Sequence, residues 1–251
     1  MGNFDEEIKT VIPSTWHVVG SSSDDQQSNE SYNVKKFGLP TPAGTSGGAC
    51  TCLLLKHLYE RQPTTTWWDV FNGVQTNLKS MGFANQTPTF TSSRKIDLKK
   101  EKLHIVPPGS NKRRALLIGI NYTGQVAELR SCQNDCINLK NYLINREGFN
   151  ESEMMILMDD GKHTPPTKEN IQNAFLKLAQ YSRAGDVNFI SFSGHGGQTE
   201  DLDGVRSGFG DICRSRSCAY FHIPGRRGRN GFNVSIVVRS RRWVGAHFLP
   251  D

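Results

Sequence analysis

Phe189-Ile-Ser-Phe-Ser-Gly-His-Gly-Gly197 is the stretch that decides the fold. Its apolar run is typical of a buried strand, and the glycines predict that the strand stops in a tight turn that carries His195. In open α/β sheets, ligands and catalytic groups gather at the carboxyl ends of the strands. A histidine titrates near neutral pH, which suits general acid and base chemistry. His195 is therefore a candidate catalytic residue; the alternative is a turn histidine that only hydrogen-bonds its neighbours.

The residues upstream predict a repeating strand–helix pattern. An apolar strand begins at Arg114, and an amphipathic helix follows from Cys132 to a stop at Gly148. A second strand spans 154–158, and Thr167 is suited to cap a second helix before the next strand. The order β-α-β-α-β predicts an α/β fold with right-handed crossovers and a parallel sheet.

Three motifs together resemble the large-subunit-like part of a metacaspase, a caspase-fold cysteine endopeptidase. They are ALLIGINYTG at 115–124, LRSCQNDC at 129–136 and FISFSGHGGQ at 189–198, in the family's order and spacing. The resemblance implies a caspase-like three-layer α/β/α fold with a mostly parallel sheet. It also makes His195 the catalytic histidine of a peptidase whose partners are protein substrates cleaved after Arg or Lys.

The resemblance further implies a substrate pocket. It makes Cys132, Asp135 and Ser193 candidates for the S1 pocket, which in metacaspases accepts an Arg or Lys side chain. Such a pocket needs a carboxylate, because a buried cation must be paired to offset its desolvation. The alternatives are a first-turn helix residue for Asp135 and a small core residue for Cys132. In a peptidase mechanism, the backbone N–H groups of Gly194 and Gly196 would stabilise the oxyanion.

The first hundred residues resemble the small-subunit-like part of the same family, placed before the large one as in type III metacaspases. The resemblance includes Gly-Gly-Ala-Cys-Thr at 47–51, which opens a helix, and an extended piece at 87–93. Thr66 and Asp69 form a variant capping box for a further helix. We expect the two parts to share one sheet and one core.

This comparison divides the chain into four segments. They are a small-subunit-like part at 1–94, a basic linker at 95–112, an incomplete large-subunit-like core at 113–204 and an Arg-rich tail at 205–251. The linker is expected to be exposed. It is either a plain solvated connection or a site of self-cleavage at its Lys and Arg residues.

The tail departs from the family. From Val205 onward it has nine Arg, no Lys and two acids, so its composition indicates a disordered segment and a shifted reading frame or truncated product. The family's nucleophile lies in an Asp-Ser-Cys-His-Ser-Gly-like motif, and neither Cys213 nor Cys218 has that motif around it. We therefore expect the chain to be inactive, as a regulator or decoy, although its family is one of cysteine endopeptidases.

Cofactor, partners and compartment follow from weaker signals. Calcium is implied by the resemblance, but Asp201 and Asp203 form an incomplete set of ligands, so no metal-binding residue is assigned. The basic excess is confined to the tail, which has few aromatic residues, and this argues against a nucleic-acid partner. Six cysteines without a secretory segment or a membrane-spanning stretch indicate reduced thiols and a cytoplasmic protein.

Overall fold

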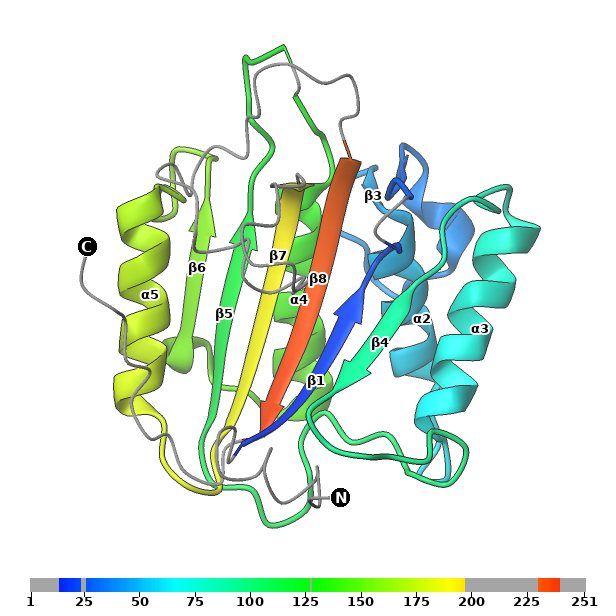
Figure 1. The fold of residues 1–251 in the computed structure, drawn as a ribbon. Helices are drawn as coiled ribbons and strands as arrows, with labels where there is room; N and C mark the ends of the chain where they lie inside the picture. Colours follow the sequence, from blue (N-terminus) through cyan, green and yellow to red (C-terminus); the bar gives the residue numbers. More distant parts are fainter. Residues whose placement is uncertain (1–13, 24–25, 127, 197–229, 240–251) are drawn as a thin grey trace, which may run out of the picture.

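A six-stranded sheet in the order β4-β1-β8-β7-β5-β6 forms the centre of the molecule (Figure 1). The structure is a computed structural model that describes residues 14–23, 26–126 and 128–196, and the backbone of 230–239. The strands are β1 (Thr15–Gly20), β4 (Thr89–Ser92), β5 (Arg113–Gly119), β6 (Met154–Met158), β7 (Val187–Gly196) and β8 (Asn230–Arg239). A separate two-stranded sheet pairs β2 (Glu30–Ser31) with β3 (Gly47–Gly48).

The strand directions are mixed at one side of the main sheet and parallel at the other. Strand β5 pairs in parallel with both β6 and β7, whereas β8 is antiparallel to β7 and β1, and β4 is antiparallel to β1. Strands β1, β5, β6 and β7 therefore point the same way, which confirms a mostly parallel sheet. The parallel β5–β7 pair places Ser193 opposite Gly119, so the candidate histidine follows the end of β5, as expected.

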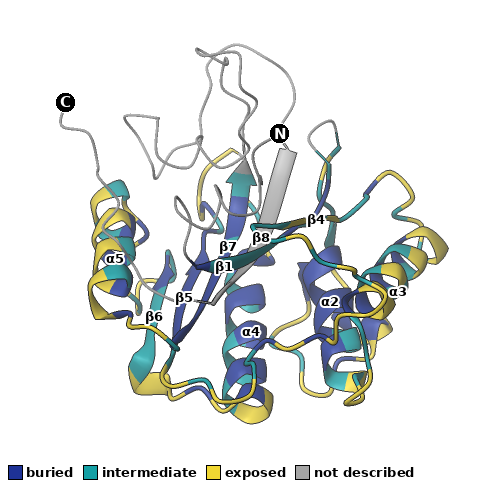
Figure 2. Cartoon of the chain, turned by 60° about the horizontal axis from the view of Figure 1, so that its bottom comes forward, coloured by how far each residue is buried: buried dark blue, intermediate teal, exposed yellow. Residues whose placement is uncertain are grey.

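Helices cover both faces of the sheet. They are α2 (Ala49–Glu60), α3 (Trp67–Ser80), α4 (Cys132–Glu147) and α5 (Lys168–Tyr181), with short 3-10 turns at Val34–Phe37 and Glu151–Glu153. Alternate residues of β5 belong to two cores: Ala115 and Leu117 pack with α2–α4, and Leu116 and Ile118 pack with α5. The three-layer α/β/α arrangement is thereby confirmed. Figure 2 shows that the sheet-facing sides of α2 and α4 are buried.

Local capping signals place the helix ends. Thr66 and Asp69 form a reciprocal capping box at the start of α3, and the Thr167 side chain accepts from the Asn170 N–H at the start of α5. Gly148 ends α4 in the left-handed conformation, with φ 66°, which glycine adopts without strain. Among the described residues, no helix is both long enough and apolar enough to cross a membrane.

The N-terminal part and the remainder share one core, as expected. Trp67 and Val74 of α3 belong to the same buried cluster as Leu139 of α4 and Phe189 of β7. Strands β1 and β4 extend the main sheet, although they reach β7 through β8 rather than directly.

Most residues of the linker are exposed, as expected, but part of it packs against the core as a strap. Leu103 and Ile105 are buried, at 4% and 3% exposure. The strap is also hydrogen-bonded to the start of α3, because the Leu103 N–H donates to the Thr65 carbonyl and the Trp67 N–H donates to the Glu101 carbonyl. The many basic residues of this segment indicated a solvated linker, but its apolar residues cover the edge of the core. We call residues 95–112 the strap below.

The expectation of a disordered tail is wrong for residues 230–239, which form β8. Val234, Ile236, Val237 and Val238 are β-branched and favour an extended backbone. The strand lies between β7 and β1 and pairs antiparallel with both. It therefore joins β1 and β4 to the rest of the main sheet. Residues 205–229 and 240–251 lie outside the described residues.

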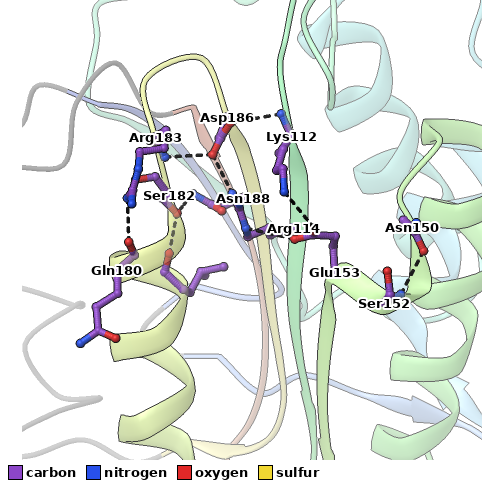
Figure 3. A network of polar contacts seen from close by, with 11 residues as sticks. Lys112, Arg114, Asn150, Ser152, Glu153, Gln180, Ser182, Arg183, Asp186 and Asn188 are labelled. Atoms are coloured by element: carbon purple, nitrogen blue, oxygen red, sulfur yellow. Dashed lines mark hydrogen bonds and ion pairs between the residues drawn. The ribbon is translucent and has the colours of Figure 1, made fainter.

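A buried ion-pair network fixes the end of the sheet where β5 and β7 begin (Figure 3). The Arg114 guanidinium lies 2.6 Å from Asp186 Oδ2 and 3.2 Å from Glu153 Oε2. Asp186 also accepts from the backbone N–H groups of Lys112 and Arg183, at 3.1 and 2.9 Å. This carboxylate therefore joins the strap, β5 and the loop before β7.

Candidate active site

His195 lies inside strand β7 and not in a turn after it. Strand β7 continues to Gly196, and His195 is paired with Gly231 of β8. Gly194 keeps the strand backbone, so left-handed geometry does not explain it. A Cβ atom at Gly194 would lie 3.0 Å from Phe192 Cζ and 3.1 Å from Tyr122 Oη. The glycine therefore allows a close approach between β7 and Tyr122, and the predicted turn is wrong for that reason.

Tyr122 positions the backbone and ring of His195. Its hydroxyl accepts a hydrogen bond from the His195 N–H at 3.1 Å, and the two ring centroids are 4.7 Å apart. Tyr122 has a φ of 55°, an uncommon conformation for a residue with a side chain. Asp159, at the end of β6, holds it there by accepting from the N–H groups of Asn121 and Tyr122 at 2.9 and 2.7 Å. Sequence reasoning missed both residues, although Asp159 directly follows a predicted strand and Tyr122 lies in the loop after another.

The proposed oxyanion donors, the N–H groups of Gly194 and Gly196, point towards strand β8. The His195 N–H points to Tyr122, and the Ser193 carbonyl accepts from the Ile120 N–H, both on the β5 side. Because backbone groups alternate in direction along a strand, the N–H groups of Gly194 and Gly196 point towards β8. In this conformation they are directed into the β7–β8 ladder.

Asp135 is the centre of a buried polar cluster that contains all three predicted pocket residues. Its Oδ2 lies 3.5 Å from Ser193 Oγ, its Oδ1 accepts from the Gly48 N–H at 3.0 Å, and Cys132 begins the same helix. Asp135 is 0% exposed. Ser193 and His195 are two residues apart on β7, so their side chains project from the same face of the strand. The structure therefore places Asp135 on the same face of β7 as His195.

The pKa of Asp135 is unusually high for an aspartate. Burial raises it to about 7, and the negative charge of Glu30 also raises it. Hydrogen bonds from the Gly48 N–H and from the Thr51 and Ser193 side chains lower it but do not cancel the effect of burial. Gly48 and Thr51 come from the N-terminal part, which sequence reasoning did not connect with this pocket.

The four thiols of the described residues are unsuited to act as nucleophiles. Cys50, Cys52, Cys132 and Cys136 are all buried. Burial raises the pKa of each thiol, and the negative charge of Asp135 raises it further, so the reactive thiolate is disfavoured.

The strand beside His195 supplies no thiol at the paired positions. Opposite Ser193–Gly196, β8 places Asn233, Phe232, Gly231 and Asn230, in that order. Cys213 and Cys218 lie outside the described residues.

Calcium binding stays a prediction. The described residues contain no group of three or more His, Cys, Asp or Glu side chains that could hold a metal ion. Asp201 and Asp203 lie outside the described residues.

The α/β/α layers, with a histidine on a central strand and a buried aspartate on the adjoining helix, define a caspase-like domain. Residues 113–215 match the family model of the metacaspase peptidase C14 domain, which identifies this part of the chain as a metacaspase-like domain. This match runs past Gly204, where we expected the resemblance to stop.

Three relatives show how much of the family the chain spans. Metacaspase III c of Phaeodactylum tricornutum is 38% identical over 205 residues, which is 80% of this chain and 60% of the relative. Metacaspase-1 of Eremothecium gossypii is 53% identical over 98 residues, 38% of this chain and 22% of the relative. Metacaspase-1B of Aspergillus fumigatus is 46% identical over 106 residues, 41% of this chain and 26% of the relative. The chain thus spans less than two thirds of each of these relatives.

Proposed function

We propose that this chain recognises an Arg or Lys side chain of a protein at Asp135, as an Arg/Lys-specific cysteine endopeptidase does, but binds without cleaving. The match to a peptidase family model supports the substrate class, which is protein. The observation that carries the proposal is the buried Asp135 carboxyl, on the same face of β7 as His195.

A basic side chain is the ligand that this carboxyl favours. A buried carboxyl group is costly to ionise. A guanidinium or ammonium group within hydrogen-bonding distance offsets that cost. The Ser193 hydroxyl and the Gly48 N–H orient the carboxyl oxygens. Because Asp135 is 0% exposed, the surrounding side chains must move to admit the ligand.

Cleavage needs a thiolate close to His195. In such a reaction the thiolate attacks the carbonyl carbon of the basic residue to form a thioester, and the C–N bond breaks as the histidine donates a proton to the leaving amine. The described thiols are buried with raised pKa values, and β8 offers none opposite His195. Without a nucleophile, turnover is expected to be about a millionfold lower than in a complete site.

An active enzyme is the second candidate, and one observation favours it. The family match extends to residue 215 and so includes Cys213. If this thiol reached His195, the chain would be a peptidase in its own right.

Two assays separate these functions. A peptide that ends in Arg should bind the purified chain more tightly than its citrulline counterpart, which lacks the positive charge, and Asp135→Asn should abolish the difference. A fluorogenic peptide with Arg at the cleaved bond should not be hydrolysed, even in millimolar calcium. Equal binding of both peptides would refute recognition at Asp135. Hydrolysis lost in both His195→Ala and Cys213→Ser would show that the chain is an active enzyme.

Other properties remain predictions from the family resemblance. The single alignment over 205 residues with a protein named Metacaspase III c supports the type III-like order of the two parts. Calcium dependence and a cytoplasmic location remain predictions, and we propose no nucleic-acid partner.

A further inference from the structure

Glu30 reaches from the N-terminal part to the start of α4. Its Oε1 accepts from the Ser131 N–H at 3.0 Å and from the Arg130 N–H at 3.2 Å, and it also accepts from the Ser131 hydroxyl. Glu30 and Arg130 are 100 residues apart in the sequence. The contact is therefore tertiary, and it joins β2 to the helix that carries Asp135.

The start of α4 needs such an acceptor. The first N–H groups of a helix have no partner within the helix, and the Ser131 side chain makes no capping bond of its own. Asn121 Oδ1 accepts from the N–H groups of Cys132 and Gln133, at 3.0 and 3.3 Å. Glu30 takes the two N–H groups just before them, where the helix dipole also favours a negative charge. Two side chains from different segments thus hold the first turn.

Glu30 also acts electrostatically on Asp135. The groups that face Asp135 come from four elements: Gly48 of β3, Thr51 and two cysteines of α2, two cysteines of α4, and Ser193 of β7. The raised pKa values keep these four thiols neutral. Glu30 adds a negative charge, and this charge contributes to the raised pKa of Asp135, after burial.

We propose that Glu30 is a positioning and specificity residue of the Asp135 pocket, which holds the first turn of α4 and adds a second negative charge that favours a cationic side chain. The N-terminal part thereby sets the affinity of a pocket whose carboxylate belongs to the large-subunit-like part. This inference rests on the proposed function and deepens it, because it names the residue that tunes recognition of the basic side chain.

Glu30→Gln separates the two roles. The glutamine keeps a carbonyl acceptor for the N–H groups of Arg130 and Ser131 but removes the charge. Affinity for a cation should fall about three- to fivefold, the size expected of one nearby charge. The proton affinity of Asp135 should fall too, because one like charge is gone, and its titration midpoint should move to lower pH. A purely structural hydrogen bond would not move that midpoint.

The experiment uses the whole chain and two readouts. Carboxyl carbon NMR follows the titration of Asp135 without ligand, from about pH 5 to about pH 9. Calorimetry measures the affinity for agmatine, which carries a guanidinium group on an alkyl chain, with the neutral N-butylurea for comparison. The matched control is Glu128→Gln, because Glu128 also accepts from a backbone N–H, that of Gly124 at 2.9 Å, in the loop before α4. Thermal melts establish that each variant is folded.

The expected result is a lower Asp135 midpoint and weaker agmatine binding in Glu30→Gln, with both unchanged in Glu128→Gln. An unmoved Asp135 midpoint in folded Glu30→Gln would overturn the inference, whatever happens to binding. Agmatine binding that is absent in the wild-type chain would refute the proposed function. The titration still decides whether Glu30 tunes Asp135, so the two failures are distinguishable.

Discussion

Two buried aspartates at opposite ends of β7 have different partners. Asp186, just before the strand, lies 2.6 Å from the Arg114 guanidinium and accepts two backbone N–H groups. Asp135, beside Ser193 near the other end, accepts from the Gly48 N–H, Thr51 and Ser193, with the negative charge of Glu30 nearby. Similar burial therefore goes with a fixed ion pair at one end and, at the other, with a carboxyl that accepts hydrogen bonds from uncharged donors.

The difference assigns a role to each end of the sheet. Removing one partner of a buried ion pair strongly destabilises the fold, which is the behaviour of a structural element. A buried carboxyl whose pKa lies near 7 changes its charge readily at neutral pH, which is the behaviour of a binding or catalytic group. The strap leads into the structural end, since the Asn111 N–H donates to the Gly185 carbonyl.

The largest effect on stability is expected at Asp186. Asp186→Ala should lower the free energy of unfolding by about 3–5 kcal/mol, because it removes the closer carboxylate partner of a buried guanidinium and the acceptor of two N–H groups. Chemical denaturation measures this loss. The control is Glu60→Ala, which removes a partly exposed pair with Lys56 and should cost less than about 1 kcal/mol. Equal losses would remove the distinction between a structural pair and a surface pair.

Asp135→Asn should change how stability depends on pH. The folded-state pKa of about 7 lies above the ordinary value of 3.8, so the folded wild-type chain binds the extra proton between these values. The stability that Asp135 contributes is therefore fully present below about pH 4 and is lost as the pH rises to about 7. Relative to Asp135→Asn, the wild-type chain should lose up to about 4 kcal/mol across this window and no more above it. Denaturation at a series of pH values measures the difference, and a flat difference would contradict the raised pKa.

A smaller effect is expected in the strap. Leu103→Ala should lower the free energy of unfolding by about 2–3 kcal/mol, towards the low end for a buried leucine because a surface segment can settle into the space. Lys99→Ala, an exposed change in the same segment, should have little effect. If both variants matched the wild-type chain in thermal melts, the strap would be the plain linker that its composition indicates.

Local signals in the sequence are sufficient for the ends of several helices. Thr66 with Asp69, Thr167 and Gly148 mark helix ends through bonds between neighbouring residues, and the structure confirms each of them. The division of alternate β5 side chains between two cores likewise follows from the sequence. The continuous apolar run of β5 is typical of a strand that is covered on both faces.

Long-range contacts were not predictable in the same way. The contact of Gly48 with Asp135 and that of Tyr122 with His195 depend on how separate segments meet, and a single sequence contains no direct record of this. The glycine of Ser193-Gly194-His195 was interpreted as a turn because glycine permits unusual dihedral angles. In the structure Gly194 matters for its small size, because a Cβ atom there would crowd Phe192 and Tyr122. The local sequence does not distinguish a glycine needed for its size from one needed for its dihedral angles.

Proton release on binding tests the central claim most directly. Agmatine should be titrated into the wild-type chain at about pH 6.5, in buffers of different ionisation enthalpy, so that calorimetry counts the protons released. Net proton release is expected, approaching one proton per ligand as the pH is lowered, because the cation converts a neutral Asp135 into its carboxylate. The release should vanish in Asp135→Asn. Binding without proton release, or release that persists in Asp135→Asn, would contradict the claim that this buried carboxyl receives the basic side chain.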